Sequence, residues 1–323
     1  MLHNLYITFS VVFPFMAYLA LGMLLRRCKV LDEHTSVKMN RFVALILFPF
    51  NLFNAIYQSD LGSMVRQPTV LYVTAGILLS ISFLMLTVPR LEKDLARQGA
   101  MVHCGFRTNA TLFALAVSEG IFGEDVPEVA VILVLAAVIN NIVSVPLLEH
   151  YQRKVLAARG ESAGKRTSIG ALLLGWFKNP LLIGVIAGIL WNLLGIPMPA
   201  PCAVTVKNIA ACAIPIAFIM LGSRLNLQHL KANRKNVLEV TIYKLILLPA
   251  VAFVYPILAG WSPQNLVAML VAFGTPTAII TYVTTGQYDC DGEMAGEIIS
   301  VSTVFSMFTI FLWLFGLKQA GLI

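Results

Sequence analysis

The sequence predicts an all-α integral membrane protein of about ten transmembrane helices, arranged as two inverted halves of five. Three observations predict this fold class: the composition, a series of charge-free stretches and an internal repeat. Of the 323 residues, 58% are hydrophobic and only 12% are charged. Soluble domains are about 25% charged, so we expect much of this surface to face lipid.

Long stretches without Asp, Glu, Lys or Arg mark the predicted helices, because a helix needs about 20 apolar residues to cross a bilayer. The clear examples are residues 2–25, 42–59, 67–89, 129–148, 179–206 and 298–317. The charge-free run 245–288 is too long for one crossing, and the turn signal at 260–263 divides it. Spans near 97–121, 199–223 and 234–258 complete the prediction.

Basic residues orient these spans. They gather in the turn after span 1, which is expected to include Lys38 and Arg41, in the turns after spans 3 and 7, and in the central loop. The opposite side carries only Arg66 and Lys318. By the positive-inside rule, both termini are predicted to lie outside. The segment 287–293 has acidic and no basic residues, but acidic residues weigh little in this rule.

The hydrophilic segment 149–168 is the expected boundary between the halves. We predict a basic cytoplasmic loop there, with the first repeat at 1–148 and the second at 169–323. Because five spans precede the loop, the second half would enter the membrane inverted relative to the first.

The internal repeat has a nearly constant spacing of 166 or 167 residues. The matched pairs include Pro14 with Pro180, Gly22 with Gly188, Pro49 with Pro215, Thr74 with Thr241 and Phe106 with Phe273. Inverted repeats are typical of transporters, because related halves can exchange roles between inward-open and outward-open states. A static bundle that duplicated for structural reasons is the alternative.

Spans 4 and 9 are predicted to be broken near the middle of the membrane. Residues 105–111 combine Gly, Thr and Asn, and residues 274–277 read Gly-Thr-Pro-Thr, a pattern that interrupts helical hydrogen bonding. Irregular backbone at this depth is tolerated only against protein or a water-filled cavity. Packing kinks are the alternative. The candidate substrate-binding residues near the breaks are Arg107, Thr108, Asn109, Thr111, Asn140, Asn141, Lys244, Thr275, Pro276 and Thr277.

Two deep cations indicate the charge of the substrate. Arg107 follows Arg97 by ten residues, so it lies about 15 Å deep at 1.5 Å per residue, and Lys244 follows Lys235 by nine and lies at a similar depth. A buried cation is costly unless it is compensated, and an anion could supply that compensation. Glu239 is a candidate for ion or proton coupling. Alternatively, Arg107 pairs with Glu239 or extends its side chain to the interface.

Other function classes lack their sequence signals. The five cysteines form no CxxC pair, and no hydrolytic triad, metal cluster or nucleotide loop is present in the sequence. The basic residues follow membrane topology, which argues against nucleic-acid binding. We therefore expect no enzyme activity, cofactor or metal. His103 lies near the predicted cytoplasmic end of span 4, where we expect no proton relay.

Several short motifs resemble the auxin efflux carrier family, which includes bacterial malonate and malate permeases and the plant PIN proteins. They are Phe106–Asn109, Glu119–Gly123, Lys178–Pro180, Leu221–Leu225, Lys244 with Pro249, and Tyr288 with Ser302 and Ser306. The resemblance covers nearly the whole chain. It implies a scaffold of spans 1, 2, 6 and 7, a transport domain of spans 3–5 and 8–10, crossed helices at spans 4 and 9, and dimers in a bacterial inner membrane.

The resemblance also assigns roles to residues. In the plant members an Asn on span 5 and the residues at the crossing contact the carboxylate, and the matching positions here are Asn141, Asn109 and Pro276. Many relatives have proline where this chain has Asn109, so the first break is expected to be softer than the second.

The expected function is a secondary active transporter or facilitator of small organic anions, mono- or dicarboxylates, by elevator-like alternating access. Two alternatives stay open: a sodium-coupled organic-anion symporter like the bile acid carriers, and a membrane ligand sensor or anion channel. The expected partners are a small carboxylate, membrane lipid and a second copy of the chain in a homodimer.

Overall fold

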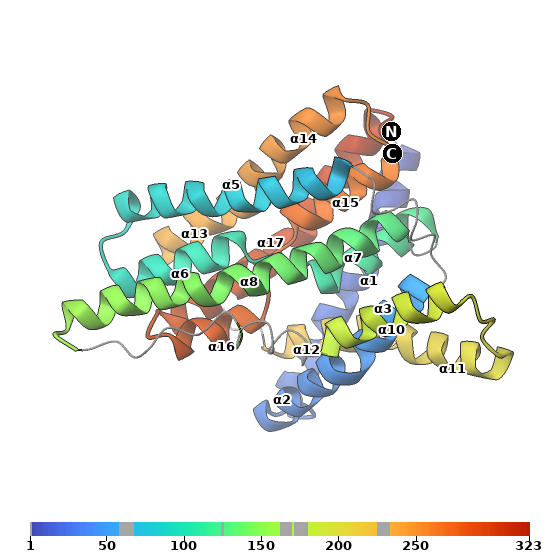
Figure 1. The fold of residues 1–323 in the computed structure, drawn as a ribbon, viewed down its shortest axis with the longest axis horizontal. Helices are drawn as coiled ribbons and strands as arrows, with labels where there is room; N and C mark the ends of the chain where they lie inside the picture. Colours follow the sequence, from blue (N-terminus) through green and yellow to red (C-terminus); the bar gives the residue numbers. More distant parts are fainter. Residues whose placement is uncertain (1, 58–67, 124–125, 162–169, 171–179, 225–232) are drawn as a thin grey trace. The chain divides into compact units, whose positions relative to one another are not determined.

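The structure is a computed structural model, and it describes residues 2–57, 68–123, 126–161, 170, 180–224 and 233–323 (Figure 1). In these residues all regular structure is helical, and the extended pairing is limited to one isolated antiparallel bridge between Thr108 and Thr277. The chain divides into two compact units, each built from three separate stretches of sequence.

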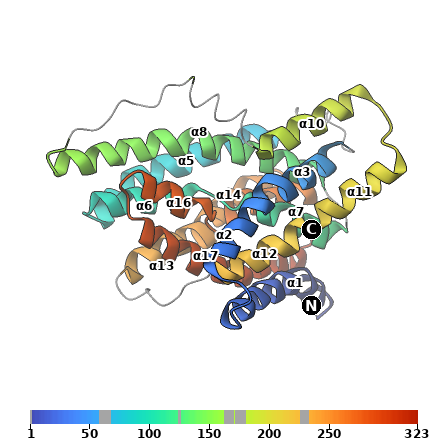
Figure 2. The same cartoon turned by 90° about the horizontal axis from the view of Figure 1, so that it is seen from below.

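The first unit consists of Met1–Pro68, Thr111–Val134 and Leu173–Leu225. Its helices are α1 (Leu2–Arg27), α2 (Glu33–Phe42), the π-helix η1 (Val43–Leu47), α3 (Phe48–Tyr57), α7 (Ala110–Phe122), the first part of α8 (Pro127–Ala158), α10 (Pro180–Leu194), α11 (Ala200–Ala211) and α12 (Ala213–Arg224). In this unit α1 packs against α12 and α3 packs against α10 (Figure 2).

Glycines allow these two helix pairs to approach closely. A Cβ atom at Gly22 of α1 would overlap the carbonyl of Ile219 on α12, and one at Gly188 of α10 would lie 3.2 Å from the carbonyl oxygen of Phe53 on α3. Gly188 follows Gly22 by 166 residues, and Ile219 follows Phe53 by the same 166. The two contacts therefore have the same spacing as the sequence repeat.

The second unit consists of Thr69–Ala110, Leu135–Leu172 and Asn226–Ile323. Its helices are α5 (Pro68–Leu91), α6 (Leu95–Phe106), the rest of α8, α13 (Arg234–Ile242), the π-helix η2 (Tyr243–Leu247), α14 (Leu248–Leu258), α15 (Pro263–Gly274), α16 (Ile280–Gln287) and α17 (Gly292–Gln319). Helix α17 is the centre of this unit, because it contacts α6, α13, η2, α15 and α16.

Two short helices form the most enclosed part of the second unit. Nine consecutive residues at the end of α6, Gln98–Phe106, are buried, and so are nine consecutive residues at the end of α15, Leu266–Gly274. A helix buried on every side is surrounded by other elements rather than lying at the surface. Both runs end where the sequence predicts a break.

Large apolar side chains cover outward faces of other helices. Leu258, for example, is 82% exposed and Leu71 is 75% exposed. Extended apolar surface of this kind marks contact with lipid or another protein. By length and hydropathy, six described helices could cross a membrane: Asn4–Arg27, His34–Tyr57, Thr69–Leu91, Ala200–Arg224, Arg234–Leu258 and Gly292–Gln319.

Two predicted loops are partly helical. Asp32 caps the start of α2 by accepting a hydrogen bond from the backbone N–H of Thr35, so Lys38 and Arg41 lie in that helix rather than in a turn. Helix α8 continues to Ala158, and the first ten residues of the predicted central loop, 149–158, are therefore helical. Good helix formers such as Leu, Gln, Arg and Ala fill that stretch. Residues 162–168 lie outside the described part.

Candidate functional site

Two interrupted helices lie at the centre of the candidate site, within the second unit. Helix α6 ends at Phe106 and α7 begins at Ala110, and helix α15 ends at Gly274 and α16 begins at Ile280. The residue that follows each first helix has extended backbone, with φ −73° and ψ 108° at Arg107 and φ −87° and ψ 154° at Thr275.

The two interruptions pair with each other through the backbone. The N–H of Asn109 donates to the carbonyl of Pro276 at 2.8 Å, and the N–H of Ala278 donates to the carbonyl of Arg107 at 3.3 Å. These two bonds flank the bridge between Thr108 and Thr277. Unpaired backbone groups are costly in an apolar interior, so each interruption satisfies polar groups that the other exposes.

Hydroxyl groups complete this pairing. Thr277 donates its hydroxyl to the carbonyl of Cys104 at 2.9 Å, which ties the second interruption to the end of α6. The N–H of Thr277 donates to the hydroxyl of Ser302 on α17 at 3.3 Å. Thr275 instead bonds within its own helix, to the carbonyl of Val271 at 2.9 Å. We call the paired segments 107–109 and 275–278 the crossing. Side chains as well as backbone groups therefore hold the crossing together.

Lys244 is fully buried in the π-helix η2. Its ammonium donates to the carbonyl of Gly105 at 3.2 Å, one residue before the end of α6. The C-terminal end of a helix carries partial negative charge, so Lys244 stabilises the interrupted end of α6. Single-turn π segments are frequent at functional sites, and this one places a cation beside the crossing.

Arg107 is 8% exposed and extends toward helix α8. Its guanidinium donates to the hydroxyl of Ser144 at 2.6 Å, and Ser144 donates to the carbonyl of Asn140 at 2.5 Å. The side-chain amide of Asn140 lies 3.4 Å from the hydroxyl of Thr108. The first interruption and α8 therefore share one polar network.

Two amide atoms of this network lack hydrogen-bond partners within the described part of the chain. They are Nδ2 of Asn109 and Oδ1 of Asn140, and both atoms are buried. Buried polar atoms in proteins are nearly always paired, and each exception calls for a reason. Asn109 follows Arg107 by two residues, and amide and guanidinium donors are groups from which an anionic ligand can accept hydrogen bonds.

The structure brings most of the predicted site residues together. Arg107, Thr108, Asn109, Asn140, Lys244, Pro276 and Thr277 all lie at or bond to the crossing, and Thr275 lies there with its hydroxyl directed into α15. The side chains of Thr111 and Asn141 lie outside the described part. Glu239 on α13 is paired with Lys235 at 3.8 Å, away from these bonds.

Four residues that bond to this site were not predicted as site residues: Ser144, which bonds to Arg107, Ser302, which bonds to Thr277, and His103, which bonds to Ser144 and to Thr285. Ser144 follows Asn140 by four residues, and His103 precedes Arg107 by four, so helical spacing places each on the face of a predicted residue. That spacing was the available signal. Thr285 and Ser302 come from α16 and α17, and nothing in the local sequence indicates their contacts. Glu297 of α17 is a further buried acid that the sequence analysis did not single out.

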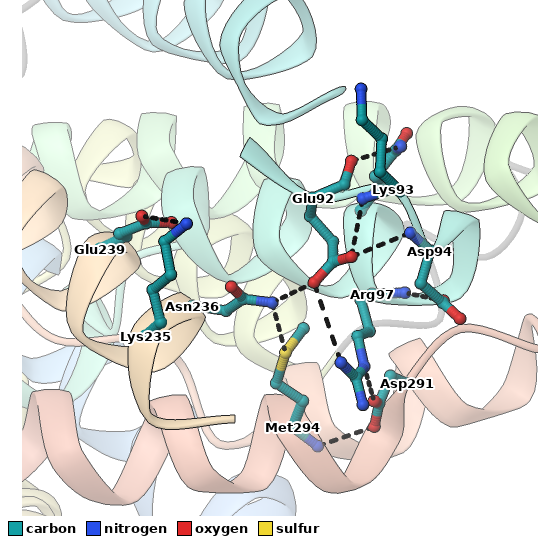
Figure 3. Close-up of polar contacts among 10 residues, drawn as sticks. Glu92, Lys93, Asp94, Arg97, Lys235, Asn236, Glu239, Asp291 and Met294 are labelled. Carbon is teal, nitrogen blue, oxygen red and sulfur yellow. Dashed lines mark hydrogen bonds and ion pairs between the residues drawn. The ribbon is translucent and has the colours of Figure 1, made fainter. Parts of the chain in front are cut away.

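A second polar cluster lies at the helix ends of the same unit (Figure 3). Glu92, in the turn between α5 and α6, accepts hydrogen bonds from the N–H groups of Lys93 and Asp94 and from the amide of Asn236 on α13. Arg97 lies 3.9 Å from Glu92 and 3.7 Å from Asp291, which caps α17. This helix-end cluster joins α6, α13 and α17.

Opposing effects act on the pKa of Glu92. Burial acts to raise it, but the hydrogen bonds from Asp94, Asn236 and Lys93 and the charge of Arg97 outweigh burial and hold the pKa below its usual value. The carboxylate is therefore ionised at neutral pH and serves as a fixed acceptor for three chain segments.

Comparison with known proteins defines the class. A family model described as "Membrane transport protein" matches residues 7–314. Similar proteins include an "Uncharacterized transporter" of Methanothermobacter thermautotrophicus, 23% identical over 91% of this chain and 93% of the relative, and a "Putative malonate transporter" of Rhizobium meliloti, 21% identical over 93% of each.

These findings make the protein a multi-pass membrane transporter. The chain belongs to the membrane transport protein family, which is the auxin efflux carrier family that its motifs resemble. The family is one of transporters, which points away from an enzyme.

Proposed function

We propose that this protein is a secondary carrier of small organic anions, mono- or dicarboxylates, that works by elevator-like alternating access. The observation that carries the proposal is the backbone pairing of the two interruptions, because the first of them brings a buried arginine, Arg107, and an amide without a described partner, Asn109, into one short segment. A carboxylate would accept from both side chains, and charge-assisted bonds of this kind are the strong ones.

Malonate is the first substrate to test. The Rhizobium meliloti relative is named a malonate transporter. A dicarboxylate also suits two buried cations, Arg107 and Lys244, within one unit. Lys244 already bonds to the end of α6, so we assign the direct contact to Arg107 and a longer-range electrostatic role to Lys244.

The proposed architecture is ten spans in two inverted repeats, at 1–148 and 169–323. The equivalent glycine contacts of Gly22 with Ile219 and of Gly188 with Phe53 support it. So do the matched buried runs at the ends of α6 and α15. Both termini are proposed to lie outside a bacterial inner membrane, with the chain forming a homodimer.

The proposed domains, a scaffold of spans 1, 2, 6 and 7 and a transport domain of spans 3–5 and 8–10, draw support from the composition of the units. The first unit gathers the segments of spans 1, 2, 6 and 7, and the second gathers those of spans 3, 8, 9 and 10. Spans 4 and 5 are divided between the units, after Ala110 and after Val134. Alternating access by a moving domain is the general mechanism of such repeats.

Counterflow in proteoliposomes tests the proposal. Vesicles preloaded with unlabelled malonate should take up labelled external malonate faster than empty vesicles, and the uptake should saturate. An anion channel gives neither result, and a sensor gives binding without flux. A dependence on external sodium would favour the bile-acid-carrier alternative, for which the unsatisfied oxygen of Asn140 offers a ligand atom.

A further inference from the structure

The proposed anion contact leaves a buried histidine of the network unused, at a position where the sequence alone predicted no proton relay. His103 is completely buried on α6, one helical turn before Arg107. Its Nδ1 lies 2.9 Å from the hydroxyl of Thr285 on α16, and its Nε2 lies 3.1 Å from the hydroxyl of Ser144 on α8. The imidazole therefore joins three helices and shares Ser144 with Arg107.

The hydrogen bonds define which ring nitrogen of His103 carries the hydrogen. Ser144 has one hydrogen, which goes to the carbonyl of Asn140, and its oxygen accepts from Arg107, which can only donate. The remaining lone pair of Ser144 must then accept from the Nε2–H of His103. Nδ1 is consequently the acceptor, and Thr285 donates to it. A neutral histidine satisfies the whole network.

Two cations act on His103, so a proton on Nδ1 would add a third positive charge. Arg107 and Lys244 both interact electrostatically with the ring. Glu297 is a buried acid on α17, a helix that packs against α6. The other charged or titratable groups on the second-unit elements that pack against α6 are Tyr72 and Arg90 on α5, Glu149, His150, Tyr151, Arg153 and Lys154 on α8, Arg234, Lys235 and Glu239 on α13, Tyr243 on η2, Tyr282 on α16, and Glu293 with Lys318 on α17.

An anion bound at Arg107 would change this balance, because its negative charge offsets the third positive charge that a proton adds. Binding of anion and proton then favour each other by the same factor. Building on the proposed function, we propose that His103 takes up one proton at Nδ1 when the anion binds and releases it with the anion on the other side. The protein would then be a proton–carboxylate symporter.

The structure accommodates the protonated state with a small change. If Nδ1 gains a hydrogen, the hydroxyl of Thr285 rotates and accepts from it. The hydrogen of Thr285 then turns to the carbonyl of Thr281, four residues earlier, which is the acceptor that helical threonines ordinarily use. The Nε2–H bond to Ser144 stays unchanged. The proton comes from water on one side of the membrane and leaves to water on the other.

The test is malonate uptake into proteoliposomes with the membrane potential clamped at zero, and with uptake by protein-free vesicles subtracted. We compare an outside-acidic gradient of one pH unit with symmetric pH. For one proton per anion, this gradient sustains up to about tenfold accumulation. The wild type should accumulate malonate severalfold, whereas in His103→Gln the ratio of uptake with and without the gradient should fall to about 1.

Two matched variants sharpen this result. His34→Gln changes an exposed histidine of α2 in the first unit, and Glu239→Gln removes the acid that the sequence predicted for coupling. Both should keep the wild-type gradient ratio. If His103→Gln keeps that ratio, or if Glu239→Gln alone loses it, the assignment to His103 is wrong. If the wild type shows no saturable counterflow, the proposed function itself is wrong.

A binding measurement covers the case in which His103→Gln does not fold. Calorimetric titration of detergent-purified wild type with malonate, in buffers of different ionisation enthalpy, gives the number of protons taken up. Uptake of about one proton per malonate, after correction for the protons bound by free malonate, supports the proposal if it persists in Lys244→Gln, which removes the other buried titratable group at the end of α6. Binding without proton uptake across pH 5.5–7.5, the range around the ordinary histidine pKa of about 6.5, rejects it.

Discussion

The two interruptions of the second unit share a backbone solution but differ in chemistry. Each follows a fully buried helix end, and each satisfies exposed backbone groups of the other. The first carries a guanidinium, an unsatisfied amide and a network that reaches α8. The second carries proline and threonine, and its polar side chains bond to neighbouring carbonyls.

This difference indicates that the two interruptions have different roles. The second interruption, with its tight internal bonds, holds the crossing together, while the first presents charge and donors to a ligand. Substitutions in each interruption separate the two roles.

Removing the charge of the first interruption should have the largest effect. Arg107→Ala should weaken malonate binding by at least about 30-fold, equivalent to about 2 kcal/mol for a charge-assisted bond. Arg107→Lys keeps the charge but loses the planar fork, so its loss should be smaller. Ligand-dependent thermal shift in detergent measures both. Wild-type affinity in a well-folded Arg107→Ala protein would place the anion elsewhere.

The second interruption should respond as a structural element. Thr277→Val leaves the buried carbonyl of Cys104 without its partner, at a cost of about 1–3 kcal/mol. We expect a lower Tm and slower counterflow. Thr275→Val is the matched control, because its hydroxyl bond has the same 2.9 Å length but stays within α15. Equal losses of counterflow in the two variants would contradict a holding role for the crossing bond.

The unsatisfied amide distinguishes ligand binding from structure. Asn109→Ala removes a donor that has no partner in the described part of the chain, so the Tm without ligand should change little. Malonate affinity should fall by about 5- to 10-fold, the equivalent of about 1 kcal/mol for one hydrogen bond. A large drop in Tm with unchanged affinity would make Asn109 a structural residue instead.

The helix-end cluster should show the smallest effect, and only in acid. The folded pKa of Glu92 lies below its unfolded value, so its stabilisation is complete above an unfolded pKa of about 4.3 and is lost as pH falls through the folded pKa. The Tm difference between wild type and Glu92→Gln should be constant from pH 7 to about pH 5 and shrink below it. A difference that grows in acid would contradict this sign.

The positions of the interruptions could be predicted from sequence, because Gly, Thr, Asn and Pro change local helix energetics wherever they occur. The pairing of Asn109 with Pro276 could not, since it joins residues far apart in the chain. Helical spacing would have indicated Ser144 and His103. The π-helical turn that places Lys244 at the end of α6 has no sequence signal that we recognise. The extension of α8 to Ala158 was not predicted because the polar composition of that stretch is typical of loops.

The enclosure of α6 has a consequence for biosynthesis. Its 12 residues extend about 18 Å, which is too short to cross a hydrocarbon core of about 30 Å. The backbone partner of its interrupted end, Thr277, is synthesised 169 residues after Thr108. During translation the polar end of α6 is therefore made long before its backbone partner. Chains that terminate before residue 277 should expose that end to the quality-control proteases of the membrane.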